Sequence, residues 1–131
     1  MTHTGHDEAL NQFLINMFPE GAPRGAEWSV KTSEEADDAV KDYIRESVWA
    51  FRADFIVDHT KLPRSAVEII ESFQEKCEGA NEAILALIED FDKFCEDAIQ
   101  ADGRGHFLSS YDGEENEEDI NGTTYYIYRE N

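Results

Sequence analysis

The sequence predicts a mainly helical domain of the α+β class, with a bundle of about four helices and a C-terminal two-stranded antiparallel hairpin. Apolar residues recur at spacings of three and four through most of residues 7–101, as they do along one face of a helix. Beyond the glycines at positions 103 and 105, the chain becomes rich in aromatic and β-branched residues, which favour strands. We therefore predict one domain over residues 1–131, helical at 7–101, with the hairpin at 105–129.

The first helix is predicted at Asp7–Phe18, where Pro19 ends the helical spacing of apolar residues. An irregular loop is expected from there to Thr32. Trp28 and Val30 are its large apolar residues, and we expect them to anchor the loop to the core, with a binding role for Trp28 as the alternative.

The second helix is predicted to begin after Ser33, a good N-cap residue, with two glutamates in its first turn, where acids interact favourably with the helix dipole. Apolar residues at helical spacing extend this prediction to about His59. They are Ala36, Val40, Tyr43, Ile44, Phe51 and Phe55.

A third helix is predicted from Ser65, with Gly79 either ending or bending it, and a fourth from Ala80 to about Ala101. The fourth helix carries a continuous apolar stripe, which we expect to form the core together with two phenylalanines from the preceding helices. The expected core residues are Leu87, Ile88, Phe91, Phe94, Phe51 and Phe73.

Two segments of the tail have strand-like composition, His106–Tyr111 and Thr123–Tyr128. The dipeptides Asp112-Gly113 and Asn121-Gly122 are typical of turns. The simplest arrangement is a hairpin of these two strands with an acidic loop at its tip.

The chain is intensely acidic, with 30 Asp and Glu against 11 Lys and Arg and a formal charge of −19. Hydrophobic residues still make up 40% of it, which is enough for a folded core. Three causes of the charge remain open: a basic binding partner, origin in a salt-loving organism, or tolerated drift. Direct binding to nucleic acid is excluded as a leading hypothesis, because phosphate contacts require clustered Lys and Arg.

The N-terminal residues are polar and lack the basic and apolar segments of a signal peptide, and no stretch has the length and hydrophobicity of a membrane span. We therefore expect a location in the cytoplasm, and in a host cell if the gene is mobile. Cys77 and Cys95 both lie within predicted helices, and we expect both to be buried free thiols.

The tail also carries a resemblance. Residues 102–115, DGRGHFLSSYDGEE, and residues 125–129, YYIYR, resemble the C-terminus of small acidic proteins of unassigned role from bacteriophages and other mobile elements. The resemblance covers the chain from about residue 102 onward. It implies a phage or prophage setting and supplies no activity.

The acids form three arrays. The array of the predicted third helix is Glu68, Glu71, Glu75 and Glu78, and the other two contain our candidate partner-binding residues. In the predicted second helix, four of them are spaced by four residues, which places them on one helix face about 6 Å apart. Six more lie within the expected hairpin tip. The two arrays, our candidate partner-binding residues, are Glu34, Asp38, Asp42 and Glu46, and Asp112, Glu114, Glu115, Glu117, Glu118 and Asp119.

The sequence gives little indication of metal binding or catalysis. The acids of the tip lack the order of a calcium-binding EF-hand loop, and the Cys and His residues lack zinc-ligand spacing, so we predict no metal and no cofactor. Ser109, His106 and Asp112 are too close together on one expected strand to form a catalytic triad, because alternate side chains of a strand face opposite ways. We expect no enzyme, and assign Arg104 and His106 to holding the hairpin against the helices.

Two hypotheses remain. The first is an inhibitor of a basic, nucleic-acid-binding host defence protein of the CRISPR or restriction type, whose acidic surface imitates DNA. The alternative is a helical adaptor or regulator that binds through an apolar face, alone or as a homodimer, with its charge serving solubility. A mimic should lose its partner with added salt, whereas an apolar interface should be nearly indifferent to salt.

Overall fold

The computed structural model describes residues 5–131, which form seven α-helices, three short 3-10 turns and three strands. The mainly helical fold with an antiparallel sheet is confirmed, although the helices are shorter and more numerous than predicted. The sequence favoured one domain, and the structure groups into two compact units. Unit 1 comprises the described residues up to Val40 with Asp102–Asn131, and unit 2 comprises Lys41–Ala101.

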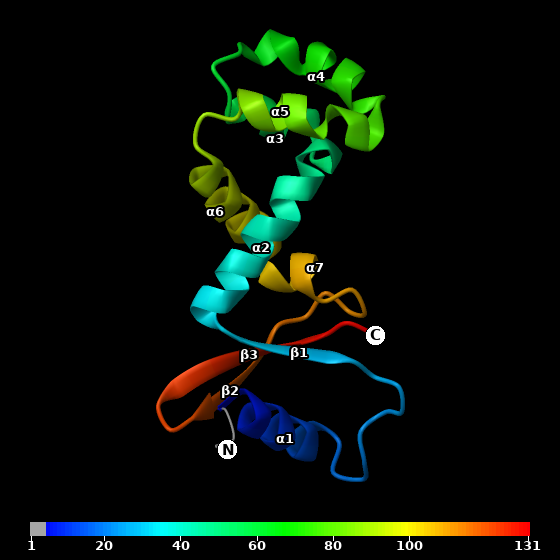
Figure 1. Ribbon diagram of the computed structural model, residues 1–131, viewed down its shortest axis with the longest axis vertical. Coiled ribbons are helices and arrows are strands. Elements are labelled where there is room, and N and C mark those ends of the chain that lie inside the picture. Colours follow the sequence, from blue (N-terminus) through cyan, green and yellow to red (C-terminus); the bar gives the residue numbers. More distant parts are fainter. Residues whose placement is uncertain (1–4) are drawn as a thin grey trace. The chain divides into compact units, whose positions relative to one another are not determined.

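Unit 1 is built on a three-stranded antiparallel sheet of β1 (Trp28–Thr32), β2 (Asn116–Ile120) and β3 (Thr123–Arg129), in the order β1-β3-β2 (Figure 1). Its central strand pairs along its length with both neighbours, so that Tyr125 lies between Thr32 and Glu118. The predicted Asn121-Gly122 turn joins β2 to β3. Both residues have positive φ, of 51° and 88°, as the tight turns of two-residue hairpins require.

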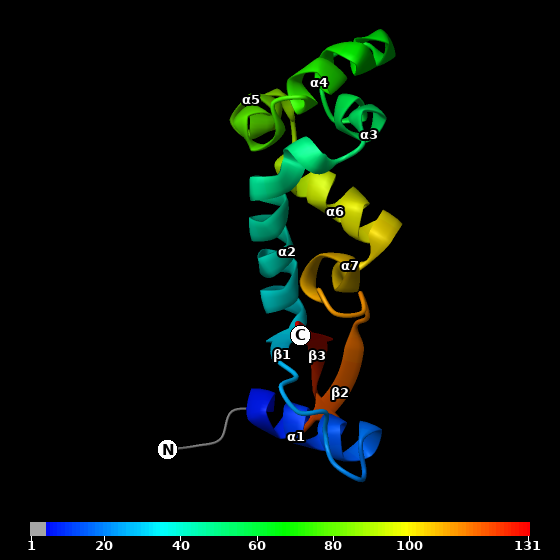
Figure 2. The same ribbon diagram turned by 90° about the vertical axis from the view of Figure 1, so that its right-hand side faces the viewer.

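Helix α1 (Gly5–Met17) covers one face of this sheet, and the short helix α7 (Arg104–Leu108) lies on the other side (Figure 2). The core beneath α1 consists of Ala9, Phe13, Tyr125 and Ile127. Trp28 and Val30 pack against this core, which confirms the expected anchoring. The segment that holds them was predicted as a loop and is instead strand β1, because its apolar and polar residues alternate.

The segment predicted as a strand at residues 106–111 is wrong, because residues 104–108 form helix α7. Gly103 precedes the helix with a φ of 83°, a conformation that few residues other than glycine adopt. Gly105 permits a close approach of the backbone of the following loop: a Cβ there would lie 2.4 Å from the carbonyl oxygen of Gly113. These two glycines determine the local structure more strongly than the strand propensity of the residues after them.

The strand that actually pairs with β3 in the hairpin is β2, which the sequence analysis assigned to an acidic loop. Two of its five side chains face solvent, since Glu117 and Asp119 are exposed while Asn116, Glu118 and Ile120 are half-buried. An edge strand tolerates charge on its solvent side, and exposed acids there discourage pairing with other chains. A charged composition therefore did not exclude a strand.

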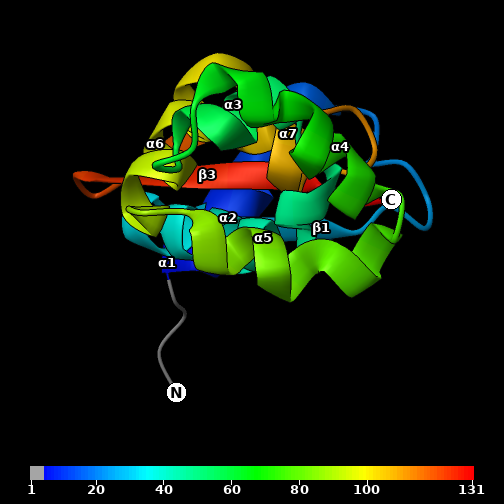
Figure 3. The same ribbon diagram turned by 90° about the horizontal axis from the view of Figure 1, so that it is seen from above.

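Unit 2 is helical. It contains the second half of α2 (Ser33–Ser47), then α3 (Ala53–Asp58), α4 (Val67–Gln74), α5 (Asn81–Leu87) and most of α6 (Phe91–Asp102), with 3-10 turns at Val48–Ala50, Arg64–Ala66 and Cys77–Ala80. Helices α3 and α4 pack against each other (Figure 3). The fully buried large side chains of the unit are Ile44, Val48, Ile56, Val57, Ile70, Ile84, Phe94 and Cys95.

The predicted second helix, expected to reach about His59, is broken after Ser47. The break is stabilised by two side-chain amides from elsewhere in unit 2. Gln74 donates to the carbonyl oxygens of Trp49 and Phe51 over 2.9 and 2.5 Å, and Asn81 accepts from the amide of Trp49 over 3.2 Å. These hydrogen bonds satisfy backbone groups that a continuous helix would have paired internally.

The predicted fourth helix is also two helices, separated at Ile88–Asp90. The amide of Glu89 donates to the carbonyl of His59 over 3.0 Å, and Asp90 caps α6 by accepting from the amide of Lys93 over 3.1 Å. Of the expected core residues, Phe94 and Ile88 are buried. The others are half-buried, namely Leu87, Phe91, Phe51 and Phe73.

The two cysteines differ. Cys95 is buried as expected, and burial raises the pKa of its thiol to about 11. Cys77 is exposed, which contradicts the expectation that both are buried. It begins a 3-10 turn with a φ of 52°, where the predicted third helix has already ended.

Candidate functional site

A polar network centred on Arg104 lies on the face of the unit 1 sheet opposite α1. From the first turn of α7, the Nε of Arg104 donates to Oε1 of Glu115 over 2.8 Å. One terminal nitrogen donates to Oδ1 of Asp37 over 3.0 Å and to the carbonyl of Ser33 over 3.0 Å. The guanidinium also lies 4.4 Å from the ring centre of Tyr126, and only 11% of the Arg104 side chain is exposed.

Tyr128 completes the network. Its hydroxyl donates to the same Oε1 of Glu115 over 2.5 Å, and its side chain is fully buried. Burial and then the hydrogen bond to Glu115 raise the pKa of Tyr128 well above its usual range. For Arg104, burial alone would lower the pKa, but the bonds to Glu115 and Asp37 keep it above its usual range. Both shifts favour the neutral form of the tyrosine and the charged form of the arginine.

This network ties α7, the start of α2 and the sheet together, which confirms the expected role of Arg104 in holding the hairpin region. His106 does not share that role and is exposed. The network places Glu115, one of the ten candidate partner-binding residues, in an internal ion pair, so we leave it out of the proposed partner surface. The roles of Asp37 and Tyr128 were not predicted from the sequence. The one local signal was the position of Arg104 between two glycines, a pattern that indicates a close approach of the backbone to a neighbouring segment.

The acids of the edge strand β2 divide between the two sheet faces. Glu117 pairs in register with Tyr126, so both side chains lie on the face that carries Arg104, and Asp119 follows on the same face. Both acids are exposed, although Asp119 accepts a hydrogen bond of 2.6 Å from the hydroxyl of Thr124. Glu118 lies on the α1 face, where it accepts from Gln12 over 3.2 Å.

Asp112 and Glu114 belong to the turn between α7 and β2 and are exposed. Oδ1 of Asp112 accepts from the hydroxyl of Ser109 over 2.8 Å and from the amide of Glu114 over 3.0 Å. Asp112 thus shapes the turn and still presents charge to solvent, whereas the carboxylate of Glu114 projects outward.

The four acids of the α2 array are all exposed on that helix, as expected from their spacing. Glu34 and Asp38 belong to unit 1, and Asp42 and Glu46 to unit 2. Asp42 lies 3.6 Å from Arg45 in an exposed ion pair. This pairing makes the carboxylate of Asp42 less available for contact with a partner.

The start of α2 is fixed by a reciprocal capping box, and the predicted N-cap, Ser33, is one residue too late. Thr32, and not Ser33, is the N-cap: its hydroxyl accepts from the amide of Glu35 over 3.2 Å, while Glu35 accepts from the amide of Thr32 over 2.8 Å. His6 lies 2.6 Å from the same carboxylate. The hydrogen bond from His6 and then that from Thr32 lower the pKa of Glu35 to about 2.

Unit 1 concentrates the charge excess. It holds 16 acids against 4 Lys and Arg, a formal charge of −12, compared with 14 against 7 in unit 2. Two of those four cations are occupied internally: Arg104 in its network, and Arg129 stacked 3.6 Å from the ring centre of Tyr111 and 5.5 Å from that of Trp28. The solvent-facing carboxylates of unit 1 are therefore poorly balanced by cations.

Ser109 occupies a structural position. Its hydroxyl is buried and bonds to Asp112 and to the carbonyl oxygen of Arg129 over 2.7 Å. Among residues 5–131, no three Asp, Glu, His or Cys side chains are arranged to hold a metal ion.

No helix within the described residues combines the length and the hydrophobicity needed to cross a membrane. Comparison with protein-family models, with curated proteins and with solved structures gave no match in any of the three. Function is therefore argued from the surface itself.

Proposed function

We propose that the protein is an inhibitor that binds a basic, nucleic-acid-binding host protein through the acidic surface of unit 1, competing with nucleic acid in the host cytoplasm. The resemblance of the tail to phage proteins suggests that the target is a defence protein of the CRISPR or restriction type. The surface consists of exposed acids from the start of α2 and from the turn and edge strand that follow α7. They are Glu34, Asp38, Asp112, Glu114, Glu117 and Asp119.

One observation carries the proposal: most carboxylates of unit 1 are exposed, while Arg104 and Arg129, two of its four Lys and Arg residues, contact aromatic rings. Surface carboxylates without matching cations repel one another, which disfavours the compact state. A row of Lys and Arg in a nucleic-acid groove removes that repulsion on binding and replaces phosphate contacts with carboxylate contacts. The network of Arg104 fixes the face from which Glu117 and Asp119 project, so the acidic surface is held in place before binding.

Capture from host lysate tests the proposal, with three acids of the surface reversed to lysine: Asp38, Glu114 and Glu117. None of these carboxylates makes an ion pair or a side-chain hydrogen bond within residues 5–131, so folding should survive. Binding should weaken by roughly 100-fold or more, because like charges at a contact cost several kcal/mol.

The matched control reverses three exposed acids of unit 2, Glu68, Glu71 and Glu78, which changes the net charge equally. This control should lose only the part of the affinity that comes from long-range attraction. Equal loss in both variants would mean that overall charge alone governs binding, and unchanged binding in the first variant would remove the proposal.

The second candidate is an adaptor that binds through an apolar face. Ile15 and Met17 of α1 are 69% and 52% exposed, large values for apolar side chains. A partner on this face would be retained when salt is raised from about 50 to 300 mM, whereas the acidic surface should release its partner.

A further inference from the structure

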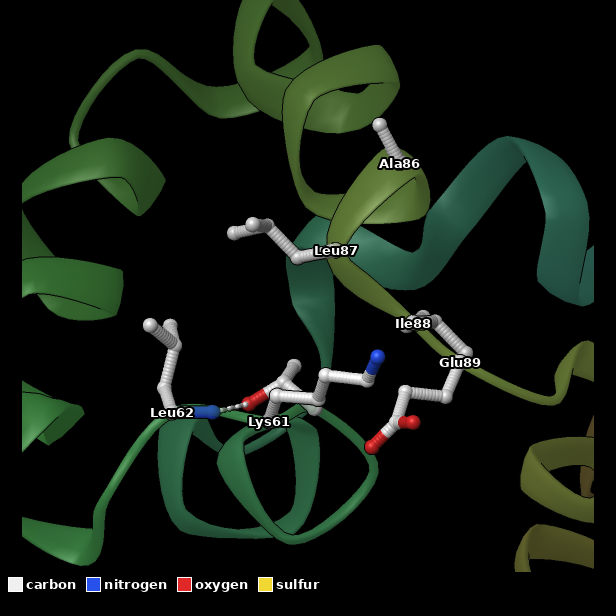
Figure 4. A pocket seen from close by; sticks show the side chains of 7 residues that line it. Lys61, Leu62, Ala86, Leu87, Ile88 and Glu89 are labelled. Carbon is white, nitrogen blue, oxygen red and sulfur yellow. Dashed lines mark hydrogen bonds between the residues drawn. The ribbon is translucent and has the colours of Figure 1, made fainter.

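Unit 2 contains an open cleft of about 410 Å³ that none of the acidic residues proposed above lines. It lies between the loop after α3, Thr60–Leu62, and the end of α5 with the break that follows it, Ala86–Glu89 (Figure 4). Its volume is within the range of sites that bind small molecules and side chains, roughly 300–1,000 Å³.

Polar and apolar atoms contribute about equally to the surface of the cleft, and the apolar part comes from Leu62, Ala86, Leu87 and Ile88. Leu62 and Leu87 flank the opening from the loop and from the helix, and both remain half-buried (Figure 4). The amide of Leu62 donates to Oγ1 of Thr60 over 3.1 Å. The hydroxyl of Thr60 in turn donates to the carbonyl oxygen of Val57. The amide of Glu89 donates to His59 on the opposite segment, which ties the two sides together. Leu62 and Leu87 therefore offer a ligand an apolar contact within a surface that is otherwise partly polar.

Charged groups line the rim. Lys61 and Glu89 are both exposed, and neither forms an ion pair with any residue from 5 to 131. Unit 2 as a whole carries a formal charge of −7, from 14 acids and 7 Lys and Arg. The net charge of unit 2 repels an anionic ligand overall, whereas a ligand that joins an apolar group to a cation can contact Leu62 and Leu87 and pair with Glu89.

We propose that this cleft binds a short segment of another protein in which a large apolar side chain stands next to a lysine or arginine. The apolar side chain packs between Leu62 and Leu87, and the neighbouring cation reaches Glu89. The ammonium of Lys61 donates a hydrogen bond to a backbone carbonyl oxygen of the bound segment. A protein segment fits better than a small metabolite because the cleft is open, whereas small ligands are usually enclosed over most of their surface. The site is independent of the acidic surface of unit 1.

Three blocked tetrapeptides test the chemistry, with binding followed through the backbone amide signals of residues 60–62 and 86–89. The first places lysine before phenylalanine between two glycines, the second replaces the lysine by glutamate, and the third replaces the phenylalanine by serine. We expect saturable shifts at these amides with the first peptide. Loss of a partly exposed ion pair should weaken the second by about two- to fivefold or more. Loss of the apolar group should weaken the third by roughly tenfold.

Variants test the location. Leu87→Ser should weaken the first peptide by roughly tenfold, whereas Leu85→Ser, a half-buried leucine of the same helix that does not line the cleft, should leave its affinity unchanged. Leu62→Ser repeats the test from the loop, should Leu87→Ser fail to fold. Absence of saturable shifts in the wild-type chain, equal binding of the glutamate or serine peptide, or equal loss in the Leu85 variant would each overturn the proposal. Because no host protein is used, this outcome is separate from that of the lysate experiment.

Discussion

Arg104 and Tyr128 donate hydrogen bonds to the same oxygen, Oε1 of Glu115, over 2.8 and 2.5 Å. Replacing Glu115 by Gln removes one of the two carboxylates that compensate a guanidinium whose side chain is 11% exposed, and leaves Asp37 as the other. Breaking a buried ion pair from one side costs about 3–5 kcal/mol, and the 27% exposure of Glu115 lowers our expectation to about 2–3 kcal/mol of unfolding free energy. Urea denaturation followed by circular dichroism measures it.

Glu114→Gln is the control, because the carboxylate of Glu114 is exposed and makes no hydrogen bond or ion pair with the residues of the network. It should change the unfolding free energy by less than about 0.5 kcal/mol. Equal effects of the two substitutions would show that the network does not stabilise unit 1.

Gly105→Ala should destabilise the protein, since a Cβ there would lie 2.4 Å from the carbonyl oxygen of Gly113 and 2.8 Å from the carbonyl carbon of Glu114. Both neighbours are backbone atoms, so relief requires moving the turn, and overpacking of this kind costs about 1–3 kcal/mol. Gly79→Ala is the matched control, because its Cβ would meet only Lys76 at 3.8 Å. Thermal melts of both variants decide the point, and a Gly105→Ala variant as stable as the control would contradict the close approach of α7 to the turn.

Glu35 gives a pH dependence. Its pKa falls from 4.5 to about 2 on folding, so its contribution to stability is complete above pH 4.5 and is lost as the pH falls through about 2. Glu35→Gln should therefore be less stable than wild type at neutral pH, by no more than about 1 kcal/mol because the group is largely exposed. The difference between the two proteins should shrink between pH 4.5 and 2. Unfolding free energies across this range test it, and a constant difference would mean that the bonds from His6 and Thr32 do not stabilise the ionised form.

The two thiols should react at different rates with Ellman's reagent. Cys77 is exposed and should react at once, whereas Cys95 is buried and burial raises its pKa to about 11, so it should react only after unfolding. Cys77→Ser should abolish the fast phase. A fast phase of two thiols in the native protein would contradict the buried position of Cys95.

The sequence predicted features that depend on local chemistry. The Asn121-Gly122 turn, the β3 strand, the anchoring of Trp28 and the exposure of the α2 acids all follow from residue type and periodicity. Features decided by distant partners were not predictable in this way. The helix break after Ser47 depends on amides of Gln74 and Asn81, and no periodicity reveals them.

The candidate surface was partly predictable for the same reason. Exposed acids at helical spacing can be recognised from sequence, but the inward position of Glu115 depends on Arg104 and Tyr128, which the fold brings together. Likewise, β2 was hidden by its charge, since an edge strand with acids on its solvent side has the composition of a loop.

Competition with nucleic acid tests the central claim most directly. The protein captured from lysate would be bound to a fluorescent DNA duplex and titrated with this chain at fixed salt. If the acidic surface occupies the nucleic-acid groove, DNA should be displaced completely, and the concentration needed should rise in proportion to the amount of DNA added. The variant with Asp38, Glu114 and Glu117 reversed to lysine should fail to displace it. A stable complex that holds the host protein, DNA and this chain together would contradict the account.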